Sequence, residues 1–134
     1  MKKKYTFTTL IITAILVIIG ILSYYKIIRP IYLNNMNQVV SIDLSKEQNV
    51  ALGKYKNQKS IYGIELEISG KTSSNFDLMI SNGEQNVHAA TIKGGEIDFV
   101  YKNDWYSDSC FLYFLPRGDK PGKLTIYCRF LALN

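Results

Sequence analysis

The stretch SCFLYFLPRGDKPGKLTIYCRF, residues 109–130, decides the fold class. Each end of it is a run of aromatic, aliphatic and β-branched side chains, as in β-strands that bury at least one face. Prolines, glycines and an aspartate lie between the two runs, and these residues favour turns. We therefore predict two antiparallel strands joined by a turn.

The same pattern recurs through most of the chain, where short apolar runs are separated by Gly, Asn and Ser. Seven or eight short strands at this spacing predict an all-β fold, an antiparallel β-sandwich of jelly-roll-like form. The strands are expected at residues 39–44, 50–55, 61–69, 76–81, 86–92, 97–102, 109–115 and 124–133.

Both cysteines of the chain lie in the opening stretch. If its two strands fold back symmetrically about Asp119, Cys110 lies directly opposite Cys128, close enough for a disulfide. Such a bond persists in an oxidising compartment. We expect a structural disulfide between Cys110 and Cys128 rather than free thiols or a metal pair, because this spacing matches no zinc motif.

An apolar segment precedes the predicted sandwich. Residues 5–22, YTFTTLIITAILVIIGIL, carry no charge. As a helix they would be about 27 Å long, close to the thickness of a bilayer core. We predict a cytoplasmic tip and one transmembrane helix in residues 1–29, a connector in residues 30–38 and the sandwich in residues 39–134.

Basic residues set the expected orientation. Lys2, Lys3 and Lys4 precede the apolar segment, and only Lys26 and Arg29 closely follow it. The positive-inside rule then puts the N-terminus in the cytoplasm and the sandwich in the periplasm or outside the cell, held in the cytoplasmic (inner) membrane by a single span. A cleaved secretory signal is the alternative and exports the same domain, although no A-x-A-like site follows the segment.

Residues 7–22 resemble the N-terminal helix of type IV pilins, including the sequence GIL at 20–22. The pilin pattern has a Gly before the Phe, where this chain has Thr6. It also has an acidic residue four positions beyond the Phe, where this chain has Ile11. The resemblance implies a structural subunit of an envelope assembly, which we keep as an alternative.

The net charge of +5 belongs to the N-terminal segment. Residues 1–29 hold five of the sixteen Lys and Arg residues and no acid, so residues 30–134 hold eleven basic residues against all eleven Asp and Glu. A domain without net positive charge lacks the electrostatic footprint of proteins that bind phosphate backbones. We therefore expect no nucleic-acid partner.

The sequence Asn-Gly at 82–83 is typical of a two-residue hairpin turn. The simplest register across it places Leu78 opposite Val87. We predict that the strands on either side of this turn pair with each other.

The sequence Gly-Gly at 94–95 predicts a second hairpin. Its simplest register places Ala90 opposite Phe99. Together with the first register, this puts apolar neighbours on opposite faces of the shared strand at 86–92. We expect a bulge near residues 89–90, or a longer second loop, to correct the phase.

These registers place His88 between Asp77 and Tyr101. An acid, an imidazole and a phenol in one row could orient a general base. A single histidine with such cross-strand neighbours more often belongs to a polar surface pair, and this is the interpretation we adopt.

The tripeptide Arg117, Gly118 and Asp119 falls at the tip of the predicted C-terminal hairpin. It resembles the exposed Arg-Gly-Asp loops that bind integrins. The same residue types are also those that a tight turn requires, so we interpret the tripeptide as turn chemistry.

The segment KNDWYSDS, residues 102–109, contains the only tryptophan. Trp105 and Tyr106 could form an aromatic contact surface with Asp104 and Asp108 as polar guides, and these four are our candidate binding residues. In the competing interpretation Trp105 closes one end of the core, because large aromatic side chains are usually buried. The two aspartates lack the ligand loop of a calcium site, so we expect no metal or cofactor here.

These features favour a non-catalytic binding module at the outer face of the membrane, with a protein partner such as an enzyme or a toxin that it inhibits or confers immunity against. A carbohydrate is a less favoured ligand. The alternative is a structural subunit of an envelope assembly, either pilin-like or associated with secretion. A hydrolase that uses Asp104 and Asp108 is a third class. The sequence shows no difference between the surroundings of these two aspartates that would make one a general acid and the other a general base.

Overall fold

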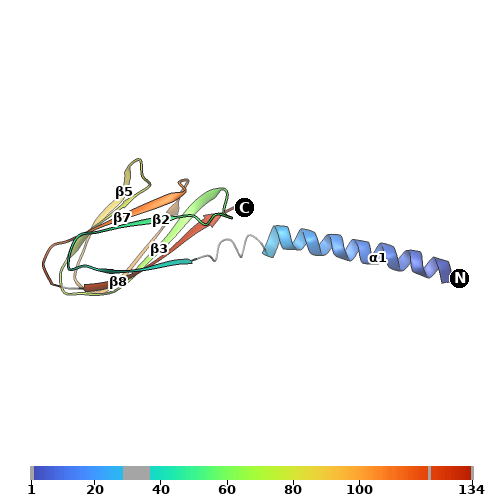
Figure 1. Ribbon diagram of the computed structural model, residues 1–134, viewed down its shortest axis with the longest axis horizontal. Helices are drawn as coiled ribbons and strands as arrows, with labels where there is room; N and C mark the ends of the chain where they lie inside the picture. Colours follow the sequence, from blue (N-terminus) through green and yellow to red (C-terminus); the bar gives the residue numbers. More distant parts are fainter. Residues whose placement is uncertain (1, 29–36, 121, 134) are drawn as a thin grey trace.

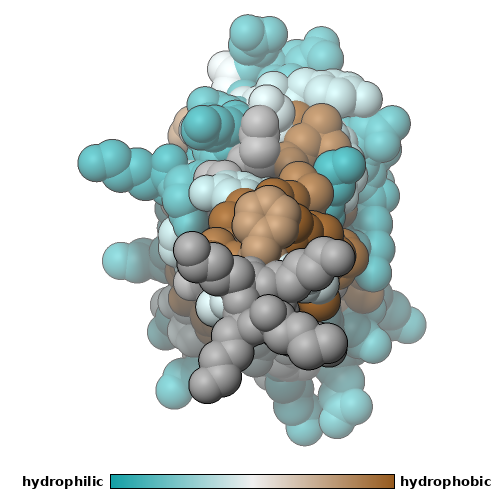
Figure 2. Space-filling model, turned by 90° about the vertical axis from the view of Figure 1, so that its right-hand side faces the viewer, coloured by the Kyte–Doolittle hydropathy of each residue, from teal (hydrophilic) through white to brown (hydrophobic). Residues whose placement is uncertain are grey.

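The computed structural model describes residues 2–28, 37–120 and 122–133. A single N-terminal helix lies apart from a body made of two β-sheets (Figure 1). Seen from the side toward which the helix extends, apolar residues of the helix fill the centre of the view, and hydrophilic residues dominate the surrounding surface of the body (Figure 2).

The helix α1 (Lys2–Ser23) continues as a π-helical turn, η1 (Tyr24–Ile28). Residues 6–28 form a helical segment that is long and apolar enough to cross a membrane, and none of it is buried against the body. The prediction of an apolar helix is confirmed, and both an anchor and a signal sequence have these properties. The predicted connector lies mostly outside the described residues, but Asn37 and Gln38 already belong to the first strand.

All eight predicted strands are present, with ends that differ from the predicted ones by a few residues at most. Two of them, at residues 76–81 and 86–92, have the predicted bounds. The strands are β1 (Asn37–Asp43), β2 (Gln48–Gly53), β3 (Ile61–Thr72), β4 (Phe76–Ser81), β5 (Asn86–Ile92), β6 (Gly95–Asp104), β7 (Ser109–Pro116) and β8 (Gly122–Ala132).

The strands form two antiparallel sheets of four strands, which confirms the β-sandwich. One sheet has the order β1-β8-β3-β6, and the other has the order β2-β7-β4-β5. Consecutive strands therefore lie in opposite sheets, with the β4–β5 hairpin as the exception. This alternation between two sheets is the arrangement of a jelly roll.

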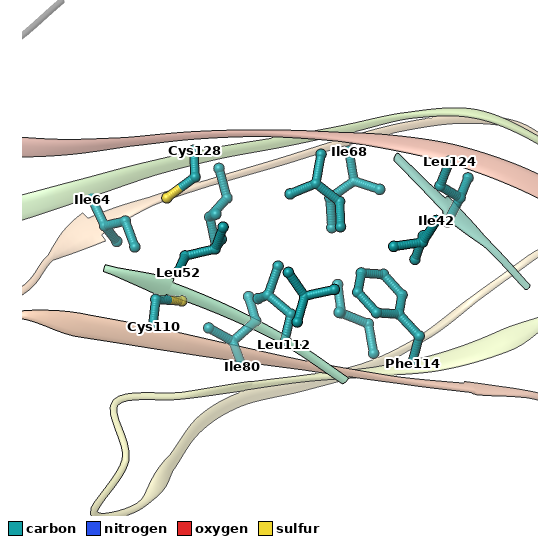
Figure 3. Close-up of a cluster of buried hydrophobic side chains, with 14 of the residues drawn as sticks. Ile42, Leu52, Ile64, Ile68, Ile80, Cys110, Leu112, Phe114, Leu124 and Cys128 are labelled. Carbon is teal, nitrogen blue, oxygen red and sulfur yellow. The ribbon is translucent and has the colours of Figure 1, made fainter. Parts of the chain in front are cut away.

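The core lies between the two sheets. Alternate residues of each strand point inward, so Ile64 and Ile68 of β3 face Ile80 and Phe114 of the opposite sheet (Figure 3). All four side chains are fully buried. Each such burial contributes about 1.5–3 kcal/mol relative to exposure in water.

The predicted disulfide is wrong. Cys110 lies on β7, where it is opposite Leu52, and Cys128 lies on β8, where it is opposite Leu66. Both cysteines are free and buried, and their sulfurs enter the core from opposite sheets (Figure 3). The symmetrical fold-back fails because the connection after β7 crosses to the other sheet instead of turning back within one sheet.

The core environment makes both thiols unreactive. Removal from water disfavours a thiolate, so burial raises the pKa of Cys110 to about 12. Burial also raises the pKa of Cys128, and the neighbouring Cys110 raises it further. The cysteines thus act as small apolar core residues.

The first predicted hairpin is present, but its register differs from the prediction. Leu78 is opposite Ala90 rather than Val87. The loop is longer than a two-residue turn, and the Asn82 Oδ1 atom accepts hydrogen bonds from the backbone N–H groups of Glu84 and Gln85. A bulge at the start of β5 leaves Val87 as the extra residue.

The second predicted hairpin is wrong. β5 and β6 belong to different sheets, so Ala90 is not paired with Phe99. The bulge lies at Val87 rather than at residues 89–90. Because the chain changes sheets after β5, the phase conflict between the two predicted registers does not arise.

We predict that a thiol-specific maleimide labels neither cysteine in the native protein. Burial raises the pKa of Cys110 to about 12, so the reactive thiolate is scarce at pH 8, and the core shields the sulfur from the reagent. Both cysteines should label in about 6 M guanidinium chloride, as measured by mass spectrometry. Labelling of native protein at the rate of a free thiol would contradict the core positions.

Candidate functional site

Three connections gather at the end of the body where β1 begins, which we call the Asn37 end. Because neighbouring strands run antiparallel, this end receives the loops at residues 54–60, 82–85 and 105–108. The loops after β1, β3, β5 and β7 lie at the opposite end.

Hydrogen bonds join the first residue of the body to these loops. The Tyr55 hydroxyl donates to the backbone oxygen of Asn37 at 3.0 Å. The residue before Tyr55 continues the connection: the Lys54 backbone N–H donates to the Asp108 carbonyl at 2.9 Å. A continuous polar connection therefore runs from the start of β1 to the loop between β6 and β7.

A groove of about 470 Å³ opens between the β4–β5 loop and the β6–β7 loop. Its walls combine aromatic rings, amides and carboxylates, and we call it the loop groove. Its lining residues are Asn82, Glu84, Val87, Tyr101, Asn103, Asp104, Trp105, Tyr106 and Ser107.

Trp105 belongs to the core and only borders the loop groove. Its side chain is 4% exposed, and its indole N–H donates to the Ser109 carbonyl at 3.2 Å. Its backbone N–H donates to the Tyr62 carbonyl at 3.1 Å. The interpretation of Trp105 as the residue that closes one end of the core is consistent with this position.

Tyr106 lies next to Trp105 but points to solvent, and it is 80% exposed. The loop that carries it is tied to the other wall of the groove, because the Ser107 hydroxyl donates to the Asn82 carbonyl at 3.1 Å. Ser107 Oγ also accepts the backbone N–H of Ser109. An exposed tyrosine is thus held on a loop with fixed ends.

The structure brings three of the four candidate binding residues to the loop groove. Asp104 lines it together with the two aromatic residues. Asp108 does not line it, because its carboxylate forms an ion pair with the Lys54 ammonium at 2.9 Å. The predicted set of four is therefore separated, and the two aspartates do not share one wall of the groove.

Sequence reasoning missed the opposite wall of the loop groove. Glu84 comes from the β4–β5 loop, about twenty residues before Tyr106. Its carboxylate and that of Asp104 form no ion pair within the described part of the chain, so both add negative charge to the groove. The Asn-Gly signal at 82–83 located the loop, but only the fold brings it to Tyr106.

His88 has one of its two predicted neighbours. Its ring lies 5.2 Å from that of Tyr101 and 6.0 Å from that of Phe99, centroid to centroid. The contact joins two edge strands of opposite sheets rather than neighbours within one sheet. Asp77 is not part of this group, so the predicted row is wrong.

Asp77 instead pairs with the arginine of the Arg-Gly-Asp tripeptide. The Arg117 Nε atom donates to both carboxylate oxygens, at 3.0 and 2.9 Å. The pKa of Asp77 is lowered, first by a hydrogen bond from Thr91 and then by Arg117. The tripeptide therefore lies at a crossover between the sheets, at the end of the body opposite the loop groove.

A second hollow, of about 540 Å³, lies on the outer face of the sheet β2-β7-β4-β5. Met79, Tyr113 and Leu115 are among its lining residues and are all partly exposed. We did not predict this surface. The signal for it is in β7, where apolar residues occupy outward as well as inward positions.

In residues 2–28, 37–120 and 122–133, no group of three or more His, Cys, Asp or Glu side chains is arranged to hold a metal ion. The residues that line the loop groove offer hydrogen-bonding groups, negative charge and one exposed aromatic ring, that of Tyr106. Such a combination can bind a complementary surface.

No protein-family model and no curated protein matches the sequence. The fold is similar to the pre-peptidase C-terminal domain of a collagenase from Bacillus anthracis, with a TM-score of 0.51 and 9% identity over 70% of this chain and 90% of that one. The Yersinia pseudotuberculosis-derived mitogen has a TM-score of 0.48 and 12% identity over 70% of this chain and 85% of that one. At such low identity the first of these similarities supports the β-sandwich fold alone.

Replacing Trp105 or Tyr106 by alanine should change the free energy of unfolding by very different amounts. Trp105→Ala should lower the free energy of unfolding by about 3–5 kcal/mol, because it leaves a large cavity in the core. Tyr106→Ala should change it by no more than about 0.5 kcal/mol, because the ring is in solvent. Chemical denaturation of both variants measures this, and a large loss for Tyr106→Ala would show that its ring supports the fold.

Proposed function

We propose that this protein is a non-catalytic binding module held at the outer face of the cytoplasmic membrane by α1, and that the loop groove receives a protein partner. The observation that carries the proposal is Tyr106, whose exposed ring stands beside a groove with fixed walls. Tyrosine is enriched among the residues that dominate binding energy at protein interfaces.

The composition of the groove favours a protein over a carbohydrate. Sugar sites present flat aromatic faces for stacking, and here the larger ring, that of Trp105, is withdrawn into the core. Tyr106 alone offers an open face, while Glu84 and Asp104 offer charges that need a cationic complement. A protein surface with a basic residue meets both requirements.

The anchor supports an extracytoplasmic location for the body. Three lysines precede the apolar part of α1, and the body that follows it has no net charge. In the proposed topology the Asn37 end is the end nearest the membrane. An extended backbone between Ile28 and Asn37 reaches about 30 Å at most, which limits how far this end stands from the lipid.

The topology has a direct test. A reporter enzyme that is active only outside the cytoplasm, fused after residue 134 of the full chain, should be active in whole cells. Replacing residues 5–22 with an unrelated apolar span should keep the reporter active and in the membrane fraction, because only length and hydropathy are needed. An inactive C-terminal reporter would place the body in the cytoplasm and refute the proposal.

Binding at the loop groove can be tested by replacing Tyr106 with a photoreactive phenylalanine derivative in the full-length protein. Ultraviolet light should then produce a covalent adduct with a second polypeptide in native membranes, because the side chain lies at the proposed interface. The same substitution at Lys71, which is exposed at the opposite end, is the control and should give no adduct. An absence of adducts from Tyr106 would remove the loop groove as a binding site.

A further inference from the structure

We propose that the partner in the loop groove is a second copy of this chain in the same membrane, which inserts the basic loop between its β2 and β3. The inference rests on the proposed function, because it needs α1 as an anchor and the loop groove as a docking site. It names the partner that the proposed function leaves open.

The charges of the two surfaces are complementary. The loop groove carries Glu84 and Asp104, and the β2–β3 loop exposes Lys56 and Lys59. None of these four side chains forms an ion pair within the described residues, whereas Lys54 of the same loop is already engaged by Asp108. Two unpaired carboxylates and two unpaired ammonium groups are therefore available for contacts between molecules.

The β2–β3 loop has a defined shape, which a docking segment needs. Gln58 belongs to this loop and is buried, and its side-chain amide donates to the Phe130 carbonyl at 2.7 Å. The same side chain accepts the backbone N–H of Tyr55 at 3.0 Å. The exposed lysines on either side of Gln58 are thus carried on an ordered turn, which reduces the entropy lost on binding.

The two surfaces lie on either side of the β6–β7 loop at the same end of the body. This loop lines the groove with Tyr106 and Ser107, while its Asp108 holds Lys54 of the basic loop by an ion pair and a backbone hydrogen bond. No residue of the basic loop lines the groove of its own molecule. The contact would be heterologous, with the loop of each copy in the groove of the next, so it can extend along a row or close into a ring.

Anchoring in one membrane aligns the two surfaces of neighbouring copies. Both surfaces are at the Asn37 end, so in two copies anchored in one membrane they stand at the same height above the lipid. The part of the body that is visible around the helix in this view is largely hydrophilic, which suits a polar contact rather than insertion into lipid (Figure 2). Confinement to one plane also raises the effective concentration of the two surfaces.

The test uses two differently tagged full-length copies expressed together. One carries Gln85→Cys beside the groove, and the other carries Asn57→Cys on the basic loop, both at exposed positions. A membrane-impermeant bismaleimide should join them into a mixed product. The native Cys110 and Cys128 are buried and should not react, as single-copy controls will show.

Charge reversal then tests the specific pairing. Glu84→Lys with Asp104→Lys in the first copy, or Lys56→Glu with Lys59→Glu in the second, should reduce the mixed product about tenfold, because like charges then face each other. Combining both reversed copies should restore it, which a merely misfolded variant could not do. Lys71→Glu with Lys123→Glu, a matched reversal at the opposite end, should have no effect.

The results separate this inference from the proposed function. No mixed product, or a product that is insensitive to both reversals, would overturn self-association. If the Tyr106 photoadduct then has the mass of one copy plus a different polypeptide, the binding function stands with another partner. If Tyr106 gives no adduct with any polypeptide, both proposals fail.

Discussion

The rest of the structure depends on the packing of the two inner sheet faces against each other. Each strand contributes alternate side chains to this layer, and residues such as Ile68 and Phe114 lose all contact with water there. Removing apolar surface from water is the main favourable term in folding, so a strand is stable only if its apolar face lies in this layer. That requirement outweighs any preference of consecutive strands to form local hairpins.

The position of the loop groove follows from this constraint. Consecutive strands run in opposite directions, so every second connection reaches the same end of the sandwich, and the β4–β5 and β6–β7 loops meet there. Hydrogen bonds from Ser107 and from the backbone of Trp105 then fix the β6–β7 loop against its neighbours. Two adjacent aromatic residues of this loop thus have different environments, since the Trp105 ring completes the core and the Tyr106 ring is exposed to solvent.

Local patterns in the sequence predicted the elements well. The apolar helix, the eight strands and the turn at residues 82–83 could each be found because side-chain period and turn chemistry act within a few residues. The sequence also shows directly that the net positive charge lies in residues 1–29 and that the rest of the chain is neutral. Three of the four candidate residues lie together for the same reason, as they are neighbours in one loop.

Pairing between strands could not be predicted in this way. The expectation that Cys110 faces Cys128, and that Ala90 faces Phe99, assumed that strands adjacent in the chain are adjacent in a sheet. The sequence by itself determined the helix, the strands and the apolar face of most of them. Only the tertiary structure decided which strands share a sheet, and hence that Glu84 lies across a groove from Tyr106 and that both thiols are buried unbonded. The physical reason is that a turn signal is the same whether the chain returns within one sheet or crosses to the other, and the burial of the whole core selects between them.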